Sequence, residues 1–203
     1  MEEESEKYKK MKEVLYKCNE YFAGRGWIAF ESLNTKLMEK CVELADKGEL
    51  EEAEEELINY YFDRERIDFL IRRLIYFKDF QPRKELFKKA LMIDGFVSDI
   101  EQYGFFTDKV NLTVWDTIVG HDSNLGKIQG ILNKGRRKTI EDEIDLPYRN
   151  GILHGRDLGY ANSKVSAKTL GILFSLRDWA DAIREGKRQE EKEYIPPTFK
   201  ESF

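Results

Sequence analysis

Cysteine, histidine and long apolar runs are all scarce in this chain of 203 residues. The two cysteines, Cys18 and Cys41, are too few for a disulfide scaffold, so we interpret both as reduced thiols of the core. No Cys or His stands at ligand spacing from either, and no carboxylate pair flanks His154, so neither a metal nor another cofactor is expected. No run of about 18 apolar residues occurs, which argues against a membrane-spanning helix and a membrane partner.

The remaining composition favours a folded, helical protein. The first residues, Met1-Glu2-Glu3-Glu4, lack the cationic start and apolar core of a secretion signal, which predicts a cytoplasmic location. Hydrophobic residues make up 41% of the chain and aromatic residues 13%, enough to fill a core. The chain contains only four prolines, and much of its sequence falls into helical periods, so we expect an all-α class.

Apolar residues recur at spacings of three and four along most of the chain, which predicts amphipathic helices. Gly24-Arg25-Gly26 should end the first of them, and an acidic stretch over 49–56 is interpreted as a solvated helix face. Segment 105–140 has weak periodicity, and no strand-like alternation longer than a few residues appears. Helices are predicted over 8–22, about 27–46, 67–77, 86–100 and 165–183.

Gln81-Pro82 predicts a boundary, because proline disfavours a helical conformation in the residue before it. We therefore expect an N-terminal helical region over 1–80, a second helical unit over 81–195 and a tail over 196–203.

Charge is unevenly distributed along the chain. The net charge is −5, and all of the excess acidity lies in residues 1–78, whereas 134–188 holds more basic than acidic residues. A polyanion would therefore bind in this later part. The cluster Lys134-Gly135-Arg136-Arg137-Lys138 admits two interpretations, an exposed loop or a contact with an RNA backbone.

Residues 145–157 carry the clearest chemical pattern. Asp145 is a plausible N-cap and Pro147 suits a first turn, so a helix should start here and its unpaired N–H groups should attract an anion. Arg149 would lie beside that anion. Asn150 and His154 are four apart, so the amide could orient the imidazole.

The positive helix end, Arg149 and Arg156 should hold His154 toward its neutral form, which can accept a proton. Five residues rotate a helix by roughly 500°, which places Arg149 and His154 about 140° apart around the axis. They converge only if Arg149 bends across the first turn, or if another subunit supplies the second half of the site.

Arg149-Asn150-x3-His154 resembles the motif of the HEPN superfamily, in which Arg is followed by a polar residue and then by His after four to six intervening positions. The string over 147–155 is similar to the abortive-infection and toxin branch. The resemblance covers about residues 83–187, and residues 1–78 match no activity that could be transferred. It implies an up-and-down bundle of four or five helices that dimerises, with two motifs facing one shared cleft.

The resemblance also implies metal-independent endoribonuclease activity, in phage defence or a toxin system. The RNA 2′-hydroxyl would attack the adjacent phosphate. His154 would move the proton, Arg149 would hold the phosphate and Asn150 would support His154. The expected RNA contacts are Arg156, Arg136, Arg137, Lys138 and Tyr148.

Two other functions stay open. A catalytically silent HEPN module could bind RNA, a nucleotide or a protein partner such as an antitoxin or a sensor. A helical interaction protein could instead act through residues 1–78. His121 is interpreted as structural, because Gly120-His121-Asp122-Ser123-Asn124 looks like a turn followed by a helix cap.

Overall fold

The computed structural model describes residues 6–63, 93, 97–98, 100–101, 103–114, 117–120, 124–135 and 137–185. These residues are mostly helical, so the helical class is confirmed, while a HEPN-like bundle stays a prediction. None of the described helices is long and apolar enough to cross a membrane. The elements are α1 (Glu6–Phe22), the 3-10 turn η1 (Ala23–Arg25), α2 (Thr35–Asp46), α3 (Leu50–Phe62), α7 (Leu125–Leu132), β1 (Ile140–Glu143), α8 (Arg149–Leu153), β2 (Asp157–Gly159) and α9 (Ser163–Arg184).

Several sequence predictions fall outside the described residues. These are the helix over 67–77, nearly all of the helix over 86–100, the boundary at 80/81 and the tail over 196–203. His121 and Arg136 also lie outside them.

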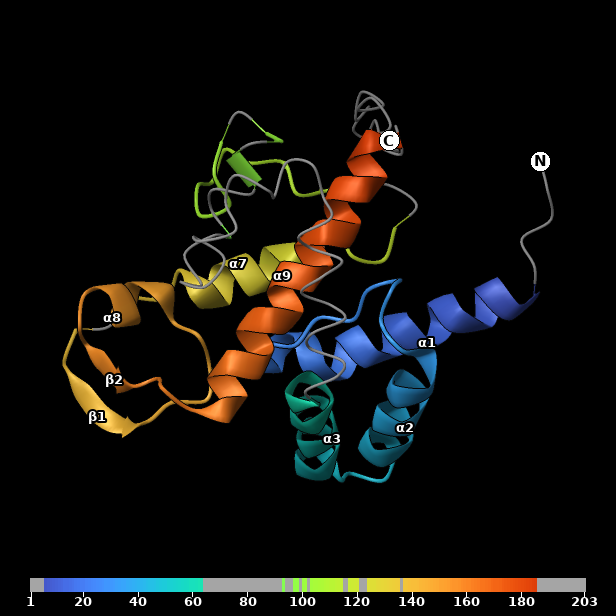
Figure 1. The fold of residues 1–203 in the computed structure, drawn as a ribbon, viewed down its shortest axis with the longest axis horizontal. Helices are drawn as coiled ribbons and strands as arrows, with labels where there is room; N and C mark the ends of the chain where they lie inside the picture. Colours follow the sequence, from blue (N-terminus) through green and yellow to red (C-terminus); the bar gives the residue numbers. More distant parts are fainter. Residues whose placement is uncertain are drawn as a thin grey trace, which may run out of the picture.

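The long helix α9 crosses the middle of the molecule and joins the N-terminal helices to the rest (Figure 1). It packs against α3, and one cluster of buried side chains runs from Leu15 in α1 to Ala182 in α9. The Tyr61 ring at the centre stacks between Trp27 and Phe174, with both centroid distances 6.2 Å. Described residues on both sides of position 80 therefore share one core.

The first and last predicted helices are confirmed, but the second begins later than predicted. Residues Trp27–Phe30 form no helix, and all four are buried. The Asn19 side chain accepts from the Ala29 N–H at 2.7 Å and donates to its carbonyl at 3.0 Å, so it replaces the bonds that a helix would supply. The helix starts at Thr35 because the Asn34 side chain caps it, accepting from the N–H groups of Lys36 and Leu37.

Two short strands were not predicted from the sequence. β1 and β2 pair in parallel, with Ile140 opposite Asp157 and Glu143 opposite Gly159, and α8 lies in the connection between them. Together they form one end of the molecule, far from the start of α1 (Figure 1). Strands of four and three residues are too short to give a recognisable alternation, so the pairing is a tertiary feature.

Gly159 allows the strands to approach closely, and we expect Gly159→Ala to disrupt their pairing. A Cβ atom there would lie 2.7 Å from Cα of Glu143, and closer still to the Asp142 carbonyl, so backbone would have to move. Gly155→Ala is the control. Gly155 has a φ of +63° but open space around its Cβ position, so this substitution should lower the free energy of unfolding by only about 1 kcal/mol. Urea unfolding and amide exchange of residues 140–143 would measure the effect of each substitution. Equal effects of Gly159→Ala and Gly155→Ala would contradict the prediction.

Both cysteines are buried and free, as expected for core thiols. Cys18 lies 3.4 Å from Sδ of Met38, and burial raises the pKa of its thiol. Burial likewise raises the pKa of Cys41 to about 12. Neither thiol is therefore a nucleophile at neutral pH.

Candidate functional site

Helix α8 is the element that carries the predicted motif, and it begins at Arg149 rather than at Asp145. The predicted N-cap role of Asp145 is therefore wrong. Two backbone carbonyls before α8 accept hydrogen bonds from side chains of α9 and its N-cap. Asn162 donates to the Ile144 carbonyl at 2.8 Å, and Lys168 donates to the Asp145 carbonyl at 3.0 Å. Because α8 spans only five residues, its dipole gives little anion attraction.

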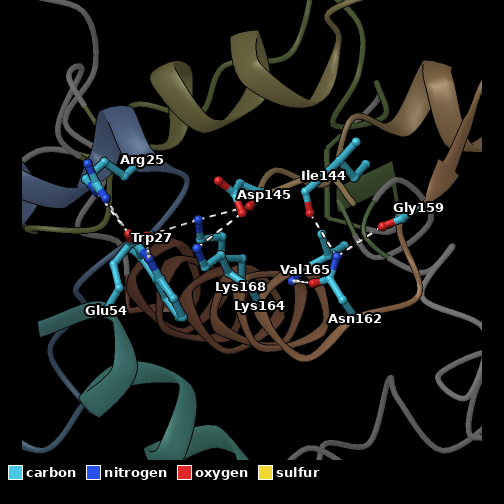
Figure 2. A network of polar contacts seen from close by, with 10 residues as sticks. All are labelled: Arg25, Trp27, Glu54, Ile144, Asp145, Gly159, Asn162, Lys164, Val165 and Lys168. Carbon is cyan, nitrogen blue, oxygen red and sulfur yellow. Dashed lines mark hydrogen bonds and ion pairs between the residues drawn. The ribbon is translucent and has the colours of Figure 1, made fainter. Parts of the chain in front are cut away.

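The start of α9 holds both chain segments that flank the motif (Figure 2). The Asn162 amide caps α9 by accepting from the Val165 N–H at 2.8 Å, and it also donates to the carbonyls of Ile144 and Gly159. Lys164 forms an ion pair of 3.1 Å with the Asp145 carboxylate. One helix end thus fixes the distance between the entry to α8 and the end of β2.

A buried charged network extends from this point into the N-terminal helices (Figure 2). Lys168 is 2% exposed and pairs at 3.1 Å with the Glu54 carboxylate of α3, which is 4% exposed. Arg25 also pairs with Glu54, and the Trp27 indole N–H donates to it at 2.7 Å. The network therefore connects α3 and the segment after α1 to the residues that lead into α8.

The two pKa values in this network are both lowered, for different reasons. Burial lowers the pKa of Lys168, although the charge of Glu54 acts against it. Burial raises the pKa of Glu54, but hydrogen bonds from Arg25 and Trp27 and the charge of Lys168 outweigh burial, so the net shift is downward. Glu54 is therefore a carboxylate at neutral pH.

Arg149 is half-buried at the first position of α8. Its Cζ lies 4.3 Å from the centroid of the Phe106 ring, and its Nη1 donates to the Asn150 side-chain oxygen at 3.2 Å. Among the described residues, the guanidinium forms its hydrogen bond through Nη1, which leaves the N–H groups of Nε and Nη2 for another acceptor. These are the N–H groups that an anion at Arg149 would contact.

Asn150 does not take the place that was predicted for it beside the imidazole. Its amide nitrogen donates to the Asn133 carbonyl at the end of α7, at 2.9 Å, and its oxygen accepts from Arg149. Its backbone carbonyl accepts from the His154 N–H at 3.1 Å, which is an ordinary helix bond. The structure thus ties Asn150 to Arg149 and α7.

His154 is exposed and directly follows the last residue of α8. The expectation that His154 lies near the amino end of a helix is wrong, because it stands at the carboxyl end of α8. Within the part of the chain that the structure describes, its imidazole has no hydrogen-bond partner. The ring is therefore available to a ligand.

Three of the predicted RNA contacts form what we call the basic strip: Arg137, Lys138 and Arg156, of which Arg156 is two positions after His154. All three are exposed. Arg156 donates to the Arg137 carbonyl at 3.0 Å, and the Ile140 N–H donates to the Arg156 carbonyl at 2.6 Å. The β1 to β2 pairing therefore brings together cations that lie almost twenty positions apart. Tyr148 is half-buried just before α8.

Three large apolar side chains are exposed near the basic strip: Leu153 at 48%, Leu158 at 49% and Tyr160 at 43%. No group of three or more His, Cys, Asp or Glu side chains in the described residues is arranged to hold a metal ion.

Four residues that contact the motif or the segments flanking it were not predicted from the sequence: Asn162, Lys168, Asn133 and Phe106. Asn162 had a signal, because Asn just before an apolar period is a preferred N-cap. Lys168 had none, since a lysine in a helix is almost always solvated. The contacts of Asn133 and Phe106 join segments far apart in sequence.

A comparison with protein families, with curated proteins and with solved structures finds no match for this chain, so its functional assignment depends on the residues described above.

Proposed function

We propose that this chain is a metal-independent endoribonuclease of the HEPN type. The observation that carries the proposal is the placement of Arg149 at the first residue of α8 and of an exposed His154 directly after its last residue. The basic strip supplies cations for the RNA backbone.

The reaction would proceed at one phosphodiester. The 2′-oxygen attacks phosphorus, its proton goes to the His154 imidazole, and the bond from phosphorus to the 5′-oxygen breaks. Arg149 stabilises the charge on the non-bridging oxygens. The leaving 5′-oxygen takes up a proton, which a second copy of the motif across a dimer cleft can supply. The products are a 2′,3′-cyclic phosphate and a 5′-hydroxyl, and the biological setting would be phage defence or a toxin system.

The test is an assay on purified full-length protein with total RNA, with a matched DNA, and with EDTA present throughout. We expect cleavage of RNA alone, with 2′,3′-cyclic phosphate ends. Cleavage of DNA, or 3′-hydroxyl products, would contradict this mechanism. Light scattering tests the dimer separately, and a strict monomer would rule out a shared cleft.

A silent module that binds RNA, a nucleotide or a protein partner such as an antitoxin is the second candidate. The exposed Leu153, Leu158 and Tyr160 favour a protein partner at this end of the molecule. RNA left intact by the folded protein, together with tight RNA or protein binding that His154→Ala does not alter, would favour this function.

A further inference from the structure

Arg149 belongs to a closed set of contacts that involves α7 and the segment before it. Arg149 donates to the Asn150 side chain, and Asn150 donates to the Asn133 carbonyl. The Asn133 amide in turn donates to the Phe106 carbonyl at 3.3 Å, and the Phe106 ring lies against the Arg149 guanidinium. Each of the four residues thus contacts the next, and the last contacts the first.

The Phe106 ring is itself held in place. Gln129 of α7 donates to the carbonyls on both sides of it, Phe105 at 2.6 Å and Thr107 at 3.1 Å. The Phe106 ring also packs edge-on against the fully buried Phe105, with centroids 5.3 Å apart. A ring fixed by its backbone and by a core neighbour is a rigid support for a planar guanidinium.

The fixed support matters because an arginine side chain loses conformational freedom when it binds. A guanidinium already stacked in one orientation loses less of that freedom and can meet the developing charge without rearrangement. The N–H groups of Nε and Nη2 meanwhile remain for the anion, as far as the described residues show.

We propose that Phe106 is a positioning residue that holds the Arg149 guanidinium ready for the scissile phosphate, with Asn133 and Asn150 closing the set. This inference rests on the proposed function and adds a residue that lies outside the Arg-x4-His motif. It also gives α7 a role, because Gln129 and Asn133 fix the segment that carries the ring.

The first test observes Arg149 directly by NMR of the full chain, with its Nε–H signal assigned through Arg149→Lys. A ring current from Phe106 displaces this signal. We expect Phe106→Leu to abolish the displacement and Phe106→Tyr to retain it. Tyr103→Leu is the control, because it removes a similar ring and cation pair with Lys109 at 5.5 Å in the same segment. An Arg149 signal unchanged in Phe106→Leu would overturn the proposal.

The second test separates positioning from binding. We expect Phe106→Leu to lower kcat for RNA cleavage about 3- to 10-fold with little change in KM, since a cation–π contact of this kind contributes about that factor. Phe106→Tyr should restore kcat. A rise in KM alone, or an unchanged kcat, would overturn the positioning role. Wild-type protein that leaves RNA intact would overturn the proposed function, while the NMR signal would still decide whether Phe106 holds Arg149.

Discussion

Replacement of His154 with alanine is expected to lower the rate of RNA cleavage by about 10²- to 10⁴-fold, which is the usual contribution of a proton-transferring side chain. Arg149→Ala should produce a loss of similar size, because the phosphate charge then has no cation held at α8. The double variant should lose little more than either single variant, since the two groups act on the same transition state. Single-turnover cleavage of a labelled RNA would measure all three rates.

His154→Ala should leave the fold intact, because the imidazole is exposed and has no hydrogen-bond partner among the described residues. Lys127→Ala on α7 is a matched control for Arg149→Ala, since Lys127 is an exposed cation that is not part of the Arg-x4-His motif. It should cleave RNA at the wild-type rate. Full activity in His154→Ala would rule out the proposed mechanism, and equal losses in Lys127→Ala would indicate a general charge effect.

The second large effect concerns stability. Glu54→Gln should destabilise the protein by about 3–5 kcal/mol at neutral pH, because it leaves the buried ammonium of Lys168 without its counter-charge. Glu56→Gln is the control on the same helix. Its pair with Lys40, at 2.8 Å, is partly exposed and should contribute no more than about 1 kcal/mol. Urea unfolding measures both.

A further variant separates charge from packing in this network. Glu54→Leu combined with Lys168→Met replaces the pair with apolar groups, and we expect it to recover much of the stability that Glu54→Gln loses. A double variant as unstable as Glu54→Gln would mean that the network acts through shape or through Arg25 and Trp27 rather than through the Lys168 charge.

The same carboxylate predicts a dependence of stability on pH. The pKa of Glu54 is lowered in the folded protein, so the unfolded chain binds this proton more readily. Its stabilisation is full above the ordinary value of 4.5 and is lost as pH falls through the lower, folded-state pKa. We expect the free energy of unfolding to fall less steeply below pH 4.5 in Glu54→Gln than in wild type. If the free energy of unfolding fell equally steeply with pH in both proteins, a lowered pKa of Glu54 would be contradicted.

Apolar periodicity was sufficient to predict the first and last helices, because an amphipathic helix needs only its own sequence to define the buried face. It failed for Trp27–Phe30, whose four buried residues continue an apolar pattern but form no helix. Their hydrogen bonds come from Asn19, a residue in the preceding helix. A bond of that kind leaves no periodic trace in the sequence.

The motif was visible in the sequence, but its local geometry was not. The residues over 145–157 were correctly predicted to contain a helix, whereas its start, the helix end at which His154 stands and the partner of Asn150 were not. Two of these involve groups from other elements: Asn162 and Lys168 of the α9 start hold the carbonyls before α8, and Asn133 at the end of α7 binds Asn150.

The sequence alone determined the helical class and the buried thiols, because these follow from residue chemistry and short-range spacing. Only the tertiary structure decided that Phe106 supports Arg149, that Arg137 meets Arg156 and that Glu54 lies against Lys168. Those contacts join segments between 19 and over 100 positions apart, and they form only when the core and the β1 to β2 pairing bring the segments together.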